Sequence, residues 1–180
     1  MTSPHLAALA ALTGLAACAT APMSATRLGP DGRPLPVVYR IGPNDGPRIR
    51  SRVRDGINTV RSQRGLAAVE LNADLTTAAA THARDMSRQS RAWHFGSDGS
   101  TPIDRVTRVG YQGRFLGELV SETFETELET LTIWLETPET RGILLDPAMR
   151  EIGFAWHQDD NGKLWWCLTT GAGASGTATS

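Results

Sequence analysis

The chain has 180 residues, of which 40% are hydrophobic and 21% are charged, and it contains two cysteines. This composition excludes a disulfide-rich scaffold and a highly charged disordered chain, and no apolar run is long enough to cross a bilayer. The net charge of −1 conceals an asymmetry, because residues 1–114 carry 15 basic and 8 acidic residues whereas residues 115–180 carry 3 and 11. A pI near 6.4, without a basic stripe interleaved with aromatic residues, argues against nucleic-acid binding.

The N-terminal segment is typical of a secretory signal. Residues 6–17 are small and apolar, too short for a membrane span, and they lead into Leu15-Ala16-Ala17-Cys18, which resembles a bacterial lipobox. We therefore predict a signal peptide over 1–17, a lipidated Cys18 and a flexible tether over 18–36. An ordinary signal peptide with a chance cysteine is the alternative. The prediction implies an extracytoplasmic lipoprotein, anchored by default in the outer membrane and facing the periplasm.

The first part of the folded region is predicted to contain a short edge strand and two amphipathic helices. The strand covers residues 37–41. Apolar residues recur at helical spacing through 48–64, where Gly65 ends the helix, and through 73–90, where Asn72 or Asp74 begins it.

Residues that favour a helix N-terminus predict a third, short helix. Thr101 is the expected N-cap, Pro102 the first helical residue and Asp104 the acid of the first turn, and the helix ends near Gly110. Residues 114–123 are then predicted to form a strand.

A fourth helix and a terminal hairpin complete the predicted fold. The first turn of the helix is predicted to contain three acidic residues, Glu125, Glu127 and Glu129, which the helix dipole favours there. Its buried face is predicted to consist of Leu128, Leu131 and Leu135. Alternating apolar residues flank the turn at 160–162. Helices followed by a hairpin predict an α+β domain over 37–170, with a disordered tail over 171–180.

Five tryptophans are informative in so small a chain. Trp165 and Trp166 are adjacent in one predicted strand, so their side chains point to opposite faces, and both faces must be covered. This pattern is typical of a central strand in a three-layer sandwich. Cys167, in the same strand, is expected to be a buried, inert thiol.

Many spaced signatures together resemble the bacterial branch of the CAP superfamily, the SCP or PR-1-like domain. They are Asn58, Arg61, Gly65-Leu66, Leu71, Leu75, Ala79, His82-Ala83, Met86, His94, Ser97-Asp98-Gly99, Arg105, Gly110-Tyr111, Gly117-Glu118, Trp134, Pro138 and Ile152-Gly153. The resemblance covers residues 48–170 and implies a three-layer α-β-α sandwich with an antiparallel sheet, generally extracytoplasmic.

The resemblance also implies a cleft lined by two histidines and two glutamates. His94 matches the first histidine, and Glu118 matches the glutamate of a Gly-Glu-Asn motif whose asparagine is lost here. Thr140 stands where the bacterial pattern places the second histidine. For the second acidic position, Glu122 and Glu136 are both candidates. His94, Glu118, Glu122, Glu136 and Thr140 are thus the predicted cleft residues.

The chemistry expected of this incomplete set is limited. Zinc prefers three or four protein ligands, and the expected second imidazole is a threonine, so no cofactor is predicted and a zinc site is disfavoured. His82 is interpreted as a satisfied core histidine and His157 as a solvated one. Asp98 and Arg105 are expected to form a structural pair or a turn contact.

The sequence therefore favours a non-catalytic protein that binds a lipid, a glycan or a protein at the cell envelope. The alternative is a hydrolase in which His94 and Glu118 are the candidate catalytic residues, with or without a metal, because an imidazole beside a carboxylate can act as a general base on water. No nucleophile motif accompanies the pair.

Overall fold

The computed structural model describes residues 38–123 and 125–174. Its elements in chain order are α1 (Gly46–Ser62), β1 (Glu70–Leu71), α2 (Ala73–Gln89), α3 (Pro102–Arg108), β2 (Phe115–Thr123), α4 (Glu127–Glu136), α5 (Pro138–Leu144), β3 (Glu151–Gln158) and β4 (Leu164–Gly171). The predicted signal peptide, Cys18, the tether and positions 175–180 of the predicted tail lie outside the described residues.

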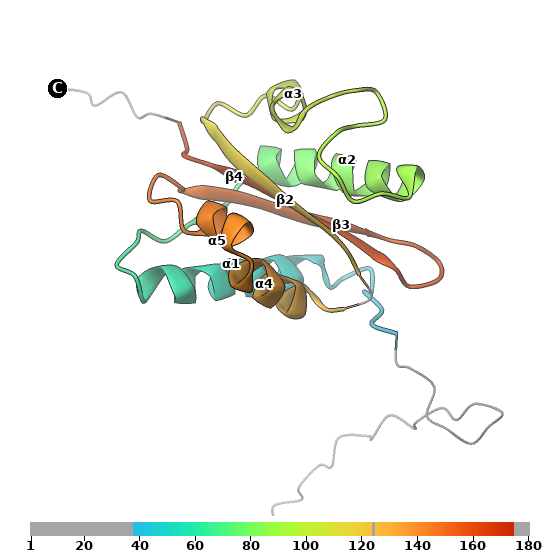
Figure 1. Cartoon of the computed structure of the whole chain (residues 1–180), viewed down its shortest axis with the longest axis horizontal. Coiled ribbons are helices and arrows are strands. Elements are labelled where there is room, and N and C mark those ends of the chain that lie inside the picture. Colours follow the sequence, from blue (N-terminus) through green and yellow to red (C-terminus); the bar gives the residue numbers. More distant parts are fainter. Residues whose placement is uncertain (1–37, 124, 175–180) are drawn as a thin grey trace, which may run out of the picture. The chain divides into compact units, whose positions relative to one another are not determined.

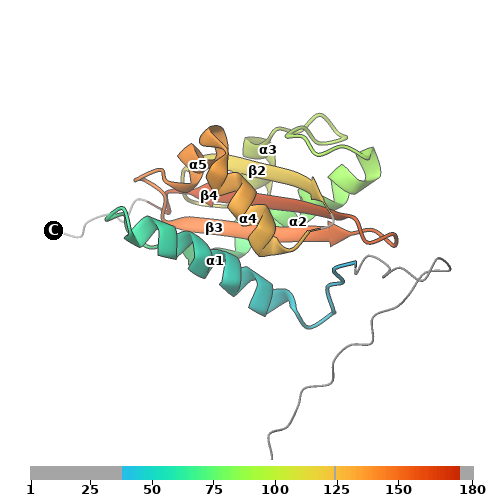
Figure 2. The same ribbon diagram turned by 60° about the horizontal axis from the view of Figure 1, so that its bottom comes forward.

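Two layers of helices enclose one four-stranded sheet (Figure 1). Helices α2 and α3 cover one face, and α1, α4 and α5 cover the other, as the turned view also shows (Figure 2). The strand order is β1-β3-β4-β2. The predicted α-β-α sandwich is confirmed, but the sheet is mixed, because β1 pairs in parallel with β3 while the other two pairs are antiparallel.

Strand β4 lies inside the sheet and is buried along its whole length. Trp165 packs with the α2 face, against Ala79, Ala83 and Met86. Trp166 packs on the opposite face, where its ring stacks on Phe154 with centroids 5.4 Å apart. The prediction that both faces of this strand are covered is confirmed.

Local sequence signals account for the starts of three helices. The side chain of Asn72 accepts a hydrogen bond from the backbone N–H of Leu75 and caps α2. Capping boxes begin the other two helices: Thr101 pairs with Asp104 at α3, and Thr126 pairs with Glu129 at α4. Glu125, predicted to lie in the first turn of α4, instead precedes its cap.

The expected edge strand is absent from the described part of segment 37–41. The side-chain amide of Gln158 replaces a partner strand there: it accepts from the backbone N–H of Ile41 at 3.1 Å and donates to the carbonyl of Tyr39 at 2.7 Å. Because a side chain takes these backbone groups, no ladder forms.

Two short elements were not predicted from the sequence. Strand β1 has two residues, and α5 has seven, starting at Pro138 directly after the junction residue Thr137. None of the helices within 38–123 and 125–174 is long and apolar enough to span a membrane.

Candidate functional site

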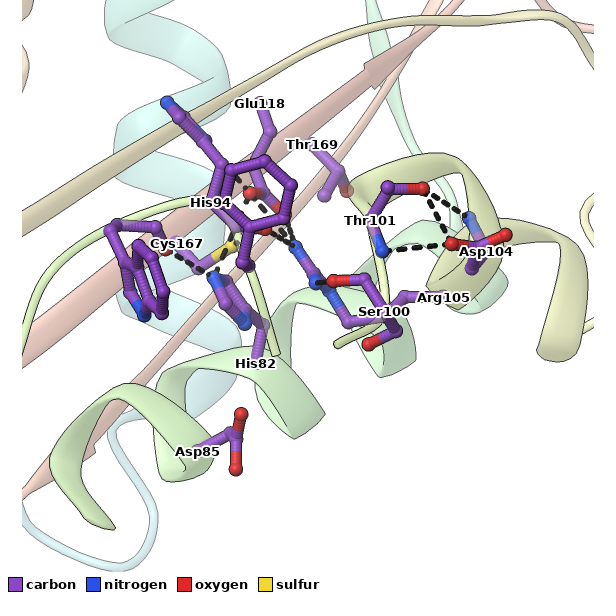
Figure 3. A network of polar contacts seen from close by, with 12 residues as sticks. His82, Asp85, His94, Ser100, Thr101, Asp104, Arg105, Glu118, Cys167 and Thr169 are labelled. Atoms are coloured by element: carbon purple, nitrogen blue, oxygen red, sulfur yellow. Dashed lines mark hydrogen bonds and ion pairs between the residues drawn. The ribbon is translucent and has the colours of Figure 1, made fainter. Parts of the chain in front are cut away.

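The carboxylate of Glu118 lies at the centre of a buried polar cluster on the α2/α3 face of the sheet (Figure 3). Along β2, Leu119 points to the other face and joins the core with α1 and α4. Side chains alternate along a strand, so Glu118 faces α2 and α3. Its side chain is only 2% exposed.

The side chains of Arg105 and His94 form hydrogen bonds to the two carboxylate oxygens of Glu118. Nη2 of Arg105, from α3, donates to Oε1 at 2.9 Å and to Oε2 at 2.8 Å. Nδ1 of His94, in the loop between α2 and α3, lies 3.0 Å from Oε1. Because a carboxylate only accepts, Nδ1 carries the hydrogen. The His94 ring is 51% exposed and turns its other nitrogen, Nε2, away from Glu118.

Arg105 also fixes the loop that carries His94. Its guanidinium donates to the carbonyl of Ser100 at 3.0 Å and to the carbonyl of His94 at 3.0 Å. From the sequence, we expected Arg105 to pair with Asp98. In the structure, Arg105 pairs with the carboxylate of Glu118. Asp98 instead accepts from the backbone N–H of Ser100 and pairs with Arg108 at 3.1 Å, so the expected turn contact of Asp98 is present.

The environment keeps Glu118 ionised. Burial alone would raise the pKa of its carboxyl, but the hydrogen bond from His94 and the charge of Arg105 outweigh burial, and the pKa of Glu118 is lowered. A carboxyl in this state is an orienting anion and not a proton donor at neutral pH.

His82, from α2, lies on the buried side of the same cluster. Its ring is fully buried, and Nε2 is 2.7 Å from the carbonyl of Trp93 and 3.7 Å from Oε1 of Glu118. A carbonyl only accepts, so Nε2 carries the hydrogen. Burial lowers the pKa of His82, so the ring is neutral and its Nδ1 is an acceptor. The expected burial of His82 is confirmed, but its Nδ1 has no hydrogen-bond partner among the described residues, so the ring is only partly satisfied, and its contact with Glu118 was not predicted.

Asp85 anchors the far end of the loop. Its carboxylate accepts from the backbone N–H of Ser97 at 2.7 Å and from the Ser97 hydroxyl at 2.6 Å, and the side chains of Arg88 and Gln89 add two further bonds at 2.8 Å. Burial opposes ionisation, but the bonds from Ser97 and Arg88 dominate and lower the pKa of Asp85 to about 2. The loop holding His94 is thus tied to α2 through Asp85 and to α3 through Arg105.

Cys167 lies beneath the cluster and is fully buried, as expected. Its sulfur is 3.7 Å from Oε2 of Glu118. Burial and the neighbouring carboxylate raise the pKa of this thiol well above its usual value, so it stays protonated and is a poor nucleophile.

The other predicted cleft residues do not join this cluster. Glu122 lies about 13 Å further along β2 and pairs with Lys163 at 2.8 Å. Thr140, on the opposite side of the sheet, donates its hydroxyl to the carbonyl of Trp134 at 2.6 Å and so stabilises the junction between α4 and α5. Glu136, at the end of α4, is exposed on that same side. His157 is also outside the cluster, 3.5 Å from Asp159.

The donor set does not fit a zinc ion. Among the residues that the structure describes, no group of three or more His, Cys, Asp or Glu side chains is arranged to hold a metal. Arg105 and His94 already bond to both oxygens of Glu118, and Nε2 of His82 bonds to a carbonyl. A metal cation at Glu118 would have to displace the guanidinium of Arg105. This is unfavourable, because the displaced charge would stay buried without its carboxylate partner.

Sequence reasoning missed the roles of His82 and Arg105. The signal that was available is burial: His82 lies on the same helical stripe as Leu75 and Ala79, and a histidine there needs a buried polar partner. Glu118, in a strand next to the central one, likewise needs a buried cation. The sequence alone does not indicate which polar groups meet.

Residues 54–169 of the chain match the sequence pattern of the CAP family, the cysteine-rich secretory protein family. The match covers more than half of the chain, and the chain therefore belongs to the CAP family. No curated protein matches it significantly.

Solved structures share the fold at low sequence identity. An outer surface protein of Borrelia burgdorferi superposes with a TM-score of 0.65 at 16% identity, over 75% of this chain and 98% of that one. An extracellular SCP-domain protein of Bacillus anthracis gives 0.58 at 20% identity, over 74% of this chain and 47% of that one. A cysteine-rich secretory protein of Staphylococcus aureus gives 0.54 at 15% identity, over 74% and 41%. This chain spans less than half the length of the latter two.

Proposed function

We propose that this CAP-domain protein is a lipid-anchored ligand-binding protein of the bacterial envelope, and that its His94–Glu118 site binds without catalysis. The observation that supports the proposal is the engagement of both Glu118 oxygens by Arg105 and His94. In this arrangement Glu118 orients the imidazole, and Nε2 of the half-exposed His94 ring is available to a ligand.

Catalysis is disfavoured because, among the residues that the structure describes, neither Glu118 nor the nucleophile candidates beside it are in a reactive state. A general acid or base works best with a pKa near the working pH, whereas the pKa of Glu118 is lowered. Of the nearby nucleophile candidates, the Ser97 hydroxyl donates to Asp85 and the Cys167 thiol is buried and protonated. Neither is activated by His94.

The location rests on the sequence and on the relatives. Leu15-Ala16-Ala17-Cys18 has the form of a lipobox, and two structures of similar fold are described as an outer surface protein and an extracellular protein. The two relatives support an extracytoplasmic location, and the lipid anchor rests on the sequence alone. The alanine that follows Cys18 favours outer-membrane sorting, facing the periplasm.

Turnover measurements test the binding role. The purified full-length chain and its His94→Ala variant are assayed on peptidoglycan, peptide and ester substrates, with His157→Ala as a control because that histidine lies outside the cluster. We expect no rate above the blank for any form. Robust turnover that His94→Ala abolishes and His157→Ala keeps would overturn the proposal.

Membrane fractionation tests the anchor separately. If Cys18 is lipidated, Cys18→Ser moves the protein from the membrane fraction to the soluble fraction. An unchanged distribution would contradict the lipoprotein assignment.

A hydrolase is the second candidate, favoured by one observation: a buried carboxylate holds the Nδ1–H of an accessible imidazole. Such an imidazole can take a proton from water through Nε2. Elemental analysis of the purified protein tests whether such a hydrolase needs a metal. A stoichiometric metal that is lost in His94→Ala would favour a metal-dependent hydrolase. An active protein without metal would leave only a metal-independent hydrolase.

A further inference from the structure

The loop that joins α2 to α3 presents two aromatic rings and a cation at the surface. Phe95 is 49% exposed, and its ring meets the partly exposed ring of Trp93 edge-on, with centroids 5.4 Å apart. The guanidinium of Arg91 lies over the Trp93 ring, 4.2 Å from its centroid. These three contacting side chains are called the Arg91–Trp93–Phe95 patch.

Hydrogen bonds hold the backbone of the patch in place. The carbonyl of Trp93 accepts from Nε2 of His82 at 2.7 Å, and its indole N–H donates to Oε1 of Gln89 at 2.9 Å. The carbonyl of Phe95 accepts from Nε2 of Gln89 at 3.2 Å. Because the loop is tied to α2 in this way, the Phe95 ring stays at the surface, and covering it with an apolar partner would be favourable.

The end of α2 adds positive charge beside the patch. Arg84 and Arg88 lie one helical turn apart, and both are exposed, as is Arg91 beyond the helix. Arg88 pairs with the buried Asp85 at 2.8 Å. Neither Arg84 nor Arg91 forms an ion pair with a carboxylate among the residues that the structure describes, so both charges are available to an anionic surface.

Two acids lie near this end of α2. Asp159 accepts from the Ser87 hydroxyl at 2.6 Å, and Asp160 is exposed. The exposed guanidinium of Arg40 donates to the backbone carbonyls of both, at 3.4 and 2.7 Å. These two acids are set against Arg40, Arg84 and Arg91, so unpaired cations remain in excess here.

The described chain begins at the same end of the domain (Figure 1, Figure 2). Arg40 reaches the turn between β3 and β4, and that turn is held to the end of α2 by the bond between Asp159 and Ser87. The tether predicted over 18–36 therefore joins the domain close to the patch. A flexible chain of that length spans on the order of 25 Å, so a lipid on Cys18 would keep this end of the domain near the bilayer.

We propose that the Arg91–Trp93–Phe95 patch docks on the phospholipid headgroups of the membrane. Phe95 enters the interface, and Arg84 and Arg91 lie near the lipid phosphates. Aromatic side chains combined with arginine are typical of surfaces that lie in this interface. The inference rests on the proposed lipid anchor and specifies how the anchored domain is oriented.

The tryptophans of the chain report the contact directly. The full-length protein is reconstituted in vesicles of phosphatidylethanolamine and phosphatidylglycerol whose acyl chains carry bromine close to the headgroup, where bromine quenches tryptophan fluorescence at short range. Trp93 and Trp156 are partly exposed, and the other three tryptophans are buried. Trp156 packs on the α1 side of the sheet. We expect quenching that Trp93→Phe removes and Trp156→Phe keeps.

A matched pair of double variants tests the side chains of the patch. Phe95→Ser with Arg91→Gln should lower the ratio of docked to undocked domain by about tenfold or more, and the quenching should be lost. Ile133→Ser with Arg141→Gln is the control, because Ile133 is 48% exposed and Arg141 is exposed on the other face of the sheet. The control should keep the quenching of the wild type.

Three results would each overturn the docking: no quenching of Trp93, equal quenching in the two double variants, or equal quenching in vesicles of neutral phosphatidylcholine. The first would leave a protein as the occupant of the patch. Failure of the proposed anchor is a separate result. If Cys18→Ser left the membrane fraction unchanged, the lipoprotein assignment would fall, whereas the quenching of Trp93 would still show whether the patch contacts lipid.

Discussion

Nη2 of Arg105 donates to both carboxylate oxygens of Glu118, at 2.9 and 2.8 Å, and both side chains are almost fully buried. This pair joins α3 to β2 and, through the carbonyl of His94, holds the loop of the candidate site. The geometry of the candidate site therefore depends on this buried ion pair.

Replacing Glu118 by Gln should destabilise the protein by about 3 to 5 kcal/mol, because it leaves the buried Arg105 charge without its carboxylate. Glu122→Gln is the matched control on the same strand. Glu122 pairs with Lys163 but is 43% exposed, so its loss should cost no more than about 1 kcal/mol. Urea unfolding measures both; equal losses would contradict the assignment of Glu118 to a buried pair.

The lowered pKa of Asp85 predicts how the free energy of unfolding depends on pH. Bonds from Ser97 and Arg88 overcome burial and lower the pKa of this carboxyl to about 2 in the folded protein, below its value in the unfolded chain. Its contribution is therefore fully present above about pH 4 and is lost as the pH falls toward 2, an effect of about 2 kcal/mol.

Asp85→Asn should remove this part of the acid dependence, as measured by the free energy of unfolding between pH 6 and pH 2. Asp55→Asn is the control, because its carboxylate is 63% exposed. A curve for Asp85→Asn that runs parallel to the wild type would show that Asp85 does not anchor the loop.

Gly153 allows α2 to pack closely on β3. A Cβ atom there would lie 2.0 Å from the backbone carbon of Leu75, and backbone cannot move aside as a side chain can. We expect Gly153→Ala to cost about 3 kcal/mol or more.

Gly142, in α5, gives the opposite expectation. A Cβ there meets no atom within 4 Å, so Gly142→Ala should stabilise the protein by about 0.5 to 1 kcal/mol through helix propensity. Thermal unfolding of the two variants compares them directly, and a harmless Gly153→Ala would argue against the close contact between α2 and β3.

The segment before α1 is held by Tyr39, whose hydroxyl donates to the fully buried Glu127 at 2.7 Å. Tyr39→Phe keeps the ring and removes this bond, which should cost about 1 to 3 kcal/mol and increase hydrogen exchange in residues 38–42. Tyr111→Phe, which removes a hydroxyl bonded to Glu151, should leave exchange in that segment unchanged. If both variants gave the same exchange, Tyr39 would not hold the segment.

Periodicity and capping residues predicted the long elements because those signals are local. The stripe of Ile49, Val53 and Ile57 predicted α1, and the adjacent Trp165 and Trp166 predicted a strand covered on both faces. Strand β1 escaped prediction because two residues show no period, and α5 because it follows α4 after a single residue.

Motifs predicted which polar residues lie near one another, but they did not predict the contacts that depend on packing between elements. His94 and Glu118, 24 residues apart, were recognised from their motifs and meet as expected. Arg105 and His82 belong to the same set of signatures, but their contacts with Glu118 were not predicted, because these contacts depend on how α3 and α2 pack on the sheet. Thr140 was predicted to line the cleft from its place in the family pattern, but its hydroxyl bonds to the carbonyl of Trp134 at a helix junction on the other face of the sheet.

The central claim is that Glu118 is a carboxylate, ionised at neutral pH, that orients His94. A carbon-detected pH titration of the Glu118 carboxyl by nuclear magnetic resonance tests it most directly. We predict a pKa below the ordinary glutamate value of about 4.3, because Arg105 and His94 stabilise the anion. A pKa raised toward neutrality, as a general acid or base requires, would contradict the account.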